Sequence, residues 1–164
     1  MRSCHINYGI KYAYRFLLKS LLLNNTKNIQ NKSILLAEGF IPARNIMSEI
    51  LQMLGYNYKT VSNGIELILE LKNKKVDLIL LDIEFAQYDG FETIEHIRRN
   101  LNYPINGVPV IAMINKDFSS NFKETFEEEG FDDIIIKPFS LNELEGKIKK
   151  VLLRPLNRYN KISN

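Results

Sequence analysis

The sequence predicts an α/β domain in which a parallel sheet is covered by helices on both faces. From residue 33 onward, short apolar runs alternate with segments of helical periodicity, and this alternation is typical of a parallel sheet. Residues 76–82 are almost continuously apolar, as expected for a central strand that has no face in solvent. With 164 residues, the chain has the length of one ordinary domain and can bury a core without disulfides.

The strands are predicted from short apolar runs that end at polar residues or turns. In chain order, they are expected at 34–37, 57–61, 76–82, 108–114 and 133–136. Because each run is separated from the next by a helical segment, consecutive strands are expected to be parallel.

The helices are predicted from apolar residues that recur every three or four positions. They are expected at 42–54, 64–73, 91–101, 118–129 and 140–152. Gly55 and Gly130 follow the first and the fourth of these segments, where a glycine commonly ends a helix. Ser140 and Glu143 have the spacing of a capping box, which marks the start of the last helix.

The composition predicts a soluble protein of a reducing compartment. Cys4 is the single cysteine and the two histidines are far apart in the sequence, so no Cys/His metal cluster is expected. The apolar stretches at 16–18 and 21–23 are too short for a membrane-spanning helix or a secretory signal. We therefore expect a cytoplasmic location.

Charge divides the chain into three parts. Residues 1–32 form a basic extension, 33–153 the predicted domain, and 154–164 a basic tail, and all 19 acidic residues lie within the predicted domain. Such an acidic body argues against a nucleic-acid-binding core. Within the extension, 8–23 has basic residues at four-residue spacing beside an apolar surface. Three interpretations stay open: a helix that contacts a membrane or an acidic partner, a helix docked on the domain, or translation from a misassigned start.

Ionisable residues follow three of the predicted strands. Glu38 follows the first, Asp82 ends the third and Lys137 follows the fifth, while Ile114 ends the fourth. In open parallel sheets, ligands bind at the carboxyl ends of the strands. Two carboxylates and a lysine suit phosphoryl transfer to Asp82, with a divalent cation held by oxygen ligands and the lysine paired with the phosphoryl oxygens. A cis bond before Pro138 would turn Lys137 toward the crevice, whereas the simpler alternative is that each carboxylate caps a turn.

A set of motifs covering about 33–153 resembles the receiver domain of two-component response regulators. The set comprises ILLAE at 34–38, LGY at 54–56, SNG at 62–64, DLILLDI at 77–83, DG at 89–90, PVIA at 109–112 and KPF at 137–139. The resemblance implies a flavodoxin-like doubly wound sheet of five parallel strands in the order 2-1-3-4-5. It also implies transfer of a phosphoryl group from a partner histidine to an aspartate, with Mg2+ required.

Carried over residue by residue, the resemblance assigns roles to four positions. Asp82 matches the phospho-acceptor, Lys137 the phosphate-pairing lysine, and Glu38 the first member of the acidic pair that binds the metal. Glu84 falls at the position whose backbone carbonyl is a magnesium ligand. Asp82 itself would be a further metal ligand.

The same resemblance also shows which positions are altered. Gly39 stands where the family usually has a second acidic metal ligand, and Ile114 stands where a hydroxyl residue binds the phosphoryl group. Ile134 replaces an aromatic switch residue and Ala86 a proline. Because Mg2+ uses few protein ligands, we expect weak Mg2+ binding. The loss of the hydroxyl donor removes about 1.5–3 kcal/mol of hydrogen bonding to a charged acceptor.

The sequence thus favours a stand-alone receiver domain that is not an enzyme. Its expected partners are a sensor histidine kinase or histidine phosphotransfer protein and a downstream protein target. The downstream contact is expected on the fourth helix, fifth strand and fifth helix, because no output domain fits in the residues that follow. The alternative is a pseudo-receiver that binds its partner regardless of phosphorylation, motivated by Gly39 and Ile114.

Overall fold

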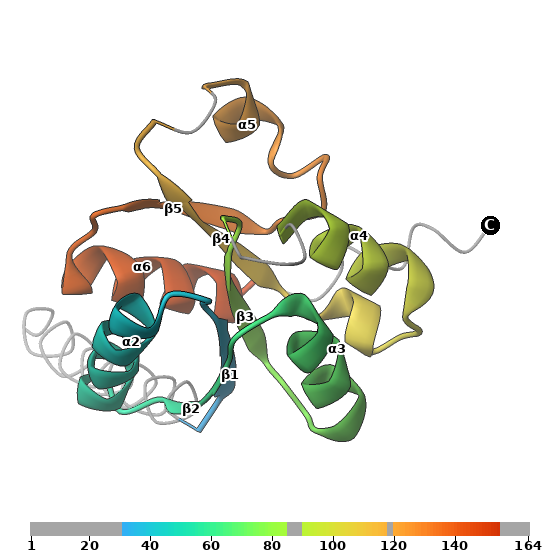
Figure 1. The fold of residues 1–164 in the computed structure, drawn as a ribbon, viewed down its shortest axis with the longest axis horizontal. Helices are drawn as coiled ribbons and strands as arrows, with labels where there is room; N and C mark the ends of the chain where they lie inside the picture. Colours follow the sequence, from blue (N-terminus) through green and yellow to red (C-terminus); the bar gives the residue numbers. More distant parts are fainter. Residues whose placement is uncertain (1–30, 85–89, 118–119, 155–164) are drawn as a thin grey trace, which may run out of the picture.

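The computed structural model describes residues 31–84, 90–117 and 120–154. Five parallel strands form one sheet in the order β2-β1-β3-β4-β5, which confirms the predicted fold class (Figure 1). The strands are β1 (Ser33–Ala37), β2 (Asn57–Val61), β3 (Leu78–Asp82), β4 (Val110–Asn115) and β5 (Asp133–Lys137). The extension at 1–30, the tail at 155–164, Ala86 and Asp89 lie outside the described residues.

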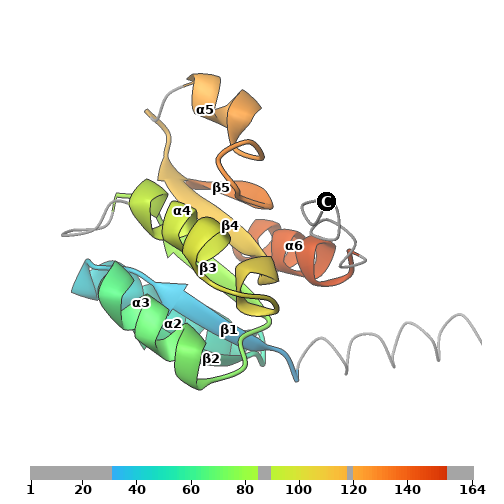
Figure 2. The same cartoon turned by 90° about the vertical axis from the view of Figure 1, so that its right-hand side faces the viewer.

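Helices cover both faces of this sheet (Figures 1 and 2). They are α2 (Ile41–Met53), α3 (Gly64–Asn73), α4 (Gly90–Asn100), α5 (Ser120–Thr125) and α6 (Leu141–Leu152), with a 3-10 turn η1 (Ile105–Gly107) before β4. Helices α2 and α6 pack on one face, and α3, α4 and α5 pack on the other. In the described ranges, no helix has both the length and the apolar character needed to cross a bilayer.

Strand β3 lies at the centre of the core and is buried along its whole length. Ile79 and Leu81 pack toward α3 and α4, whereas Leu78 and Leu80 pack toward α2 and α6. This alternation explains the nearly continuous apolar run, since both faces of the strand meet a helix layer. Asp82 is therefore a charged residue at the end of an otherwise apolar strand.

Two predicted starts are supported by the capping contacts in the structure. The side chain of Asn63 accepts a hydrogen bond from the Glu66 N–H at 2.9 Å at the start of α3. Ser140 accepts from the Glu143 N–H at 3.2 Å at the start of α6. Both contacts satisfy N–H groups that the helix itself cannot pair, so local sequence suffices to set where these helices begin.

The prediction of a helix over 118–129 was wrong in length. Helix α5 ends at Thr125, and turns carry the chain from there to Gly130, which has φ of +96°. The Thr125 carbonyl accepts from the Glu128 N–H at 2.9 Å, a contact of a tight turn. Acidic side chains at 127–129 would face the negative end of a longer helix, which disfavours its continuation.

Strands β3 and β4 each begin two residues later than predicted. The prediction placed these starts at 76 and 108, whereas the structure has them at Leu78 and Val110. Pro109 has no N–H to contribute to the sheet, although its carbonyl accepts from the Ile79 N–H at 2.9 Å. The carboxyl ends, which carry the candidate site, are close to those predicted.

Candidate functional site

Three ionisable side chains meet at the carboxyl edge of the sheet. Glu38 directly follows β1, Asp82 ends β3 and Lys137 ends β5. The Lys137 Nζ lies 3.1 Å from the Glu38 Oε2 and 2.9 Å from the Asp82 Oδ2. The structure therefore brings together the three residues that the sequence singled out, with one ammonium between two carboxylates.

The remaining carboxylate oxygens accept hydrogen bonds from the backbone. The Phe40 N–H donates to the Glu38 Oε1 at 3.0 Å, and the Glu84 N–H donates to the Asp82 Oδ1 at 3.2 Å. Glu38 is only 1% exposed and Asp82 only 6%. Such burial is costly for charged groups unless each one is paired, and these contacts supply the pairing.

Burial and the neighbouring charges shift two pKa values in this cluster. Burial raises the pKa of Glu38, and the nearby Asp82 charge adds to that rise, while the Phe40 N–H and Lys137 partly oppose it. Burial alone would lower the pKa of Lys137, but the hydrogen bonds and charges of Asp82 and Glu38 outweigh it and raise the pKa. Lys137 therefore stays protonated, as a partner for anionic oxygens must be.

Glu84 lies at the outer side of the cluster. Its side chain is exposed, and its Oε2 accepts a hydrogen bond from the Asn115 side-chain amide. Asn115 ends β4 and pairs in register with Lys137 of β5. The contact of Asn115 with Glu84 was not predicted, because nothing in the local sequence shows which side chain of a distant segment faces Asn115.

Two of the altered positions, Ile114 and Ile134, lie in apolar packing. Ile114 is fully buried among the hydrophobic residues on the α3, α4 and α5 face, and Ile134 packs against the same group. Gly39 follows Glu38 and provides no carboxylate. The Lys137–Pro138 peptide bond, which the sequence analysis considered as a cis bond, is cis. The Tyr103–Pro104 bond is also cis, and this second cis bond was not predicted.

The donor set fits a magnesium ion that keeps most of its water ligands. Among the described residues, no group of three or more His, Cys, Asp or Glu side chains is placed to hold a metal ion. Glu38 and Asp82 nevertheless form a pair of carboxylates, and Mg2+ commonly binds through one or two carboxylates and several waters.

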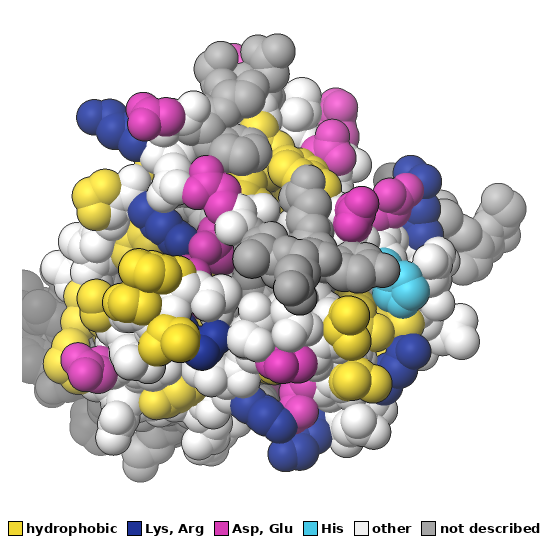
Figure 3. Space-filling model, viewed as in Figure 1, with side chains coloured by type: hydrophobic (Ala, Val, Ile, Leu, Met, Phe, Trp, Pro, Cys, Tyr) yellow, Lys and Arg dark blue, Asp and Glu magenta, His cyan; other side chains and the backbone are white. Residues whose placement is uncertain are grey.

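Hydrophobic side chains lie beside this charged edge. They gather over α2 and α6 in the view of Figure 3, and at the start of α2 Phe40 and Ile41 are 68% and 61% exposed.

Arg44, on the first turns of α2, donates from its guanidinium to the Glu38 carbonyl at 2.9 Å. This contact ties the loop after β1 to α2 and so helps to hold Glu38 in place.

Curated proteins are similar to this chain in sequence. A probable transcriptional regulator ycf27 from Cyanidium caldarium is 31% identical over 140 residues, which cover 85% of this chain and 54% of that protein. A homolog of the transcriptional regulatory protein CpxR from Haemophilus influenzae is 31% identical, over 80% of this chain and 55% of its own length. The chain thus spans about half the length of these curated relatives.

Solved structures resemble this fold as well. The receiver domain of sensor histidine kinase PA1611 from Pseudomonas aeruginosa, which has a magnesium ion coordinated in its active site cleft, superposes with a TM-score of 0.67 and 25% identity, covering 74% of this chain and 98% of that one. The chemotaxis protein CheY4 of Vibrio cholerae, at 23% identity, has a TM-score of 0.65 with the same 74% and 98% coverage and supports the fold. The family model of the response regulator receiver domain matches residues 34–149, and the chain therefore belongs to that family of two-component signalling modules.

Proposed function

We propose that this receiver domain accepts a phosphoryl group on Asp82 from a histidine of a partner protein, either a sensor histidine kinase or a histidine phosphotransfer protein. The observation that carries the proposal is the 2.9 Å contact between the Asp82 carboxylate and the Lys137 ammonium at the carboxyl edge of the sheet. A carboxylate there can attack phosphorus while a fixed cation stabilises the charge that develops.

The transfer would break one bond and form another. An oxygen of Asp82 forms a bond to phosphorus, the bond from phosphorus to the imidazole nitrogen breaks, and its electron pair stays on that nitrogen. The Lys137 ammonium, now shared with Glu38, would pair with the phosphoryl oxygens. Glu38 would form no covalent bond in this step. Its carboxylate would keep the Lys137 ammonium and Mg2+ next to the acceptor Asp82.

Mg2+ is the proposed cofactor, and binding is expected to be weak. Glu38, Asp82 and the backbone carbonyl of Glu84 would hold the ion, which when bound neutralises charge on the phosphoryl oxygens. Gly39 leaves one carboxylate fewer than the family usually supplies. The PA1611 receiver, with its coordinated magnesium ion, is the relative that supports this assignment.

Signalling is proposed to run through protein contacts in the cytoplasm. The expected contact surface is α5, β5 and α6, and the expected target is a downstream protein. The region 34–153 contains all 19 acidic residues of the chain, which disfavours direct contact of this region with nucleic acid. For the basic extension at 1–32, contact with an anionic membrane or an acidic partner is proposed, and salt-sensitive binding to anionic vesicles would test it.

A second candidate function is a pseudo-receiver that binds its partner independently of phosphorylation. The observation that favours it is the complete burial of Ile114 in the hydrophobic core, at the position where a hydroxyl would contact the phosphoryl group. An apolar side chain held there cannot hydrogen-bond to the phosphoryl oxygens. Gly39 favours the same alternative by weakening the metal site.

Intact-mass measurement after incubation with acetyl phosphate and Mg2+ tests the leading proposal. The wild-type chain should gain the mass of one phosphoryl group, and Asp82→Asn should gain none. Asp117→Asn is the matched control, because it makes the same chemical change at an exposed carboxylate after β4. Retention of the added mass in Asp82→Asn would reject Asp82 as the acceptor.

The Ile114→Thr variant separates the two candidates. If the domain is a phospho-receiver, the new hydroxyl should increase phosphoryl retention, since a hydrogen bond to a charged acceptor contributes about 1.5–3 kcal/mol. If neither wild type nor Ile114→Thr is modified, and a captured partner binds wild type and Asp82→Asn equally, the pseudo-receiver is the correct description.

A further inference from the structure

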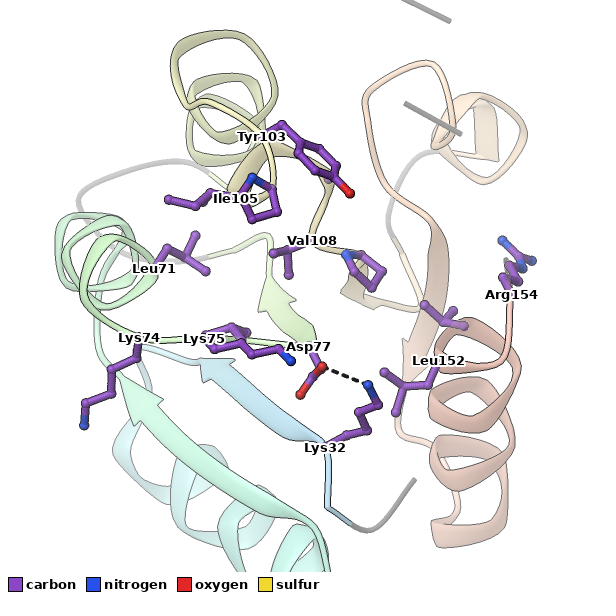
Figure 4. A pocket seen from close by; sticks show the side chains of 15 residues that line it. Lys32, Leu71, Lys74, Lys75, Asp77, Tyr103, Ile105, Val108, Leu152 and Arg154 are labelled. Atoms are coloured by element: carbon purple, nitrogen blue, oxygen red, sulfur yellow. Dashed lines mark hydrogen bonds and ion pairs between the residues drawn. The ribbon is translucent and has the colours of Figure 1, made fainter. Parts of the chain in front are cut away.

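A cavity opens at the opposite end of the sheet from Asp82. It has a volume of about 310 Å³ and lies where β3 and β4 begin. Its lining comes from four parts of the chain: Lys32 before β1, the end of α3 with the following loop, the segment around η1, and the end of α6 (Figure 4). The phosphoryl-transfer site uses none of these residues.

The walls of this cavity are mainly apolar. Leu71 of α3, Val76 and Val108 before the central strands, and Leu152 of α6 contribute aliphatic side chains. The Tyr103 side chain stands at the rim beside Ile105 in Figure 4, and Tyr103 is 72% exposed. Organic ligands commonly bind in cavities of about 300–1,000 Å³ with apolar walls and a few polar groups. The size and the lining of this cavity fit that description.

The charged side chains around the cavity are mostly basic. Lys32, Lys74, Lys75 and Arg154 contribute four cations, and Asp77 contributes the single carboxylate of the lining. The domain as a whole is acidic, so this concentration of positive charge is a local feature. It favours occupancy by an anion.

Two of the four cations already have a carboxylate partner. Lys32 pairs with Asp77 at 3.0 Å, and Lys74 lies 3.6 Å from Glu70 on α3. The second oxygen of Asp77 accepts from the Ser33 N–H at 2.9 Å. The carboxylate of the cavity is therefore hydrogen-bonded to Lys32 and to the start of β1, and the Lys75 charge acts on it without a direct ion pair.

The other two cations lack such a partner. Within the described part of the chain, the exposed Lys75 forms no ion pair with a carboxylate, and Figure 4 shows its side chain reaching toward Asp77. Arg154 donates to the Asp132 carbonyl at 2.9 Å, which leaves its charge without a carboxylate in the same described part. Lys75 is the cation placed best for an anionic group inside the cavity.

We propose that this cavity binds a small amphipathic organic anion, with its apolar body against the aliphatic walls and its anionic group beside Lys75. The apolar lining accounts for the body of such a ligand, and Lys75, which has no direct ion pair among the described residues, accounts for its charge. Residues 1–31 and 155–164 contain basic but no acidic side chains, so the chain's own flanking segments do not provide a matching acidic side chain. The proposal does not depend on phosphorylation of Asp82.

A pair of fluorescent probes tests this inference with the full chain. The probes are 8-anilino-1-naphthalenesulfonate and N-phenyl-1-naphthylamine, which share their aromatic body and differ in the sulfonate. The anionic probe should bind more tightly, and Lys75→Gln should weaken its affinity about threefold to tenfold, as expected for a partly exposed charge contact. The same variant should leave the affinity for the neutral probe unchanged.

Lys72→Gln is the matched control, because Lys72 is an exposed lysine of α3 that does not line the cavity. It should leave the affinity for both probes unchanged. Amide chemical shifts should move on addition of the anionic probe at 71–77, 103–109 and 151–154. Equal effects of Lys72→Gln and Lys75→Gln, absence of binding of the anionic probe, or shifts confined to other regions would each overturn the proposal.

Discussion

At the scale of single residues, Lys137 decides the electrostatics of the candidate site. Its ammonium lies within 3.1 Å of both Glu38 and Asp82, two carboxylates that are almost completely buried. Two like charges this close would disfavour each other's ionised form, and the lysine compensates both. A cation therefore has to compete with Lys137 for these oxygens.

The substitution Gly39→Asp should increase the affinity for Mg2+. It restores a carboxylate next to Glu38, and we expect at least about a tenfold change, which corresponds to about 1.4 kcal/mol. Isothermal titration of both proteins with MgCl2 measures the difference. Gly146→Asp is the control, because it adds the same charge on α6, where a new Cβ meets nothing within 4 Å.

Equal gains in Gly39→Asp and Gly146→Asp would mean that added negative charge alone attracts the ion. An unchanged affinity in Gly39→Asp would mean that position 39 does not border the metal site. Either result would rule out Gly39 as the cause of weak Mg2+ binding.

At the scale of elements, Arg98 ties α4 to two neighbouring segments. Its guanidinium donates to the carbonyls of Asn106, Val108 and Gly130 at 2.7–2.9 Å, and it pairs with Asp132 at 3.0 Å. The side chain is only 10% exposed. Arg98 thus provides hydrogen bonds to three carbonyls that lie outside the hydrogen-bonded sheet. These bonds form only when the distant segments that carry the carbonyls have folded together.

Replacing Arg98 by Met should destabilise the domain by about 3–5 kcal/mol, because it removes the cation that pairs with the buried Asp132 carboxylate and the donor to three loop carbonyls. Arg99→Met should change the free energy of unfolding by no more than about 0.5 kcal/mol. Arg99 is 76% exposed, and among the described residues its ion pair is with Glu95 on the same helix. Urea unfolding of both variants measures the contrast, and similar losses in the two would contradict it.

Two glycines, one inside a helix and one in a turn, should respond in opposite ways to replacement by alanine. Gly146 lies inside α6 with open space around its added Cβ, so Gly146→Ala should stabilise the domain by about 0.5–1 kcal/mol. Gly130 has φ of +96°, and an added Cβ would lie 3.0 Å from the Arg98 side chain, so Gly130→Ala should destabilise it. Thermal unfolding of both variants should give midpoint shifts of opposite sign, and shifts of the same sign would contradict this reasoning.

At the scale of the whole molecule, ion pairs to a buried carboxylate link α6 to the sheet. Asp133, at the start of β5, is 3% exposed and pairs with Lys147 at 2.8 Å and with Lys150 at 2.7 Å on α6. Burial would raise the pKa of Asp133, but the two lysines and the Ile134 N–H outweigh it and lower the pKa. Folding therefore favours the ionised form of Asp133.

The stability of the domain should consequently fall in acid. A carboxyl whose pKa is lowered by folding stabilises the native state above its unfolded pKa, and that contribution disappears as the pH falls through the folded value. Urea unfolding from pH 7 to about pH 3 should show Asp133→Asn less stable than wild type at neutral pH, with a difference that shrinks in acid. Asp117→Asn, at an exposed position, should show no such convergence. A difference that persists in acid would assign the role of Asp133 to packing.

The sequence by itself determined the class of fold and the three charged residues of the site. Apolar periodicity, helix caps and strand-end residues act within a few positions of each other, so α3 and β2 have the predicted bounds. Helix α5 was predicted too long, because the prediction used the apolar pattern at 118–129 alone. That pattern does not include the unfavourable position of the acidic side chains at the negative end of a longer helix. Asp82, Glu38 and Lys137 were found because parallel strands bring their carboxyl ends to one edge.

Only the tertiary structure decided which of these groups touch. Lys137 and Glu38 are 99 positions apart, and their pairing depends on β1, β3 and β5 lying at set distances in one sheet. The contact between Asn115 and Glu84 and the basic cavity at the other end of the sheet arise in the same way, from segments that meet only after folding. Local sequence patterns determine the helices and strands, whereas the packing of distant elements determines which charged groups pair. Contacts between distant segments leave no periodic pattern in the sequence, and these pairs could therefore not be predicted from it.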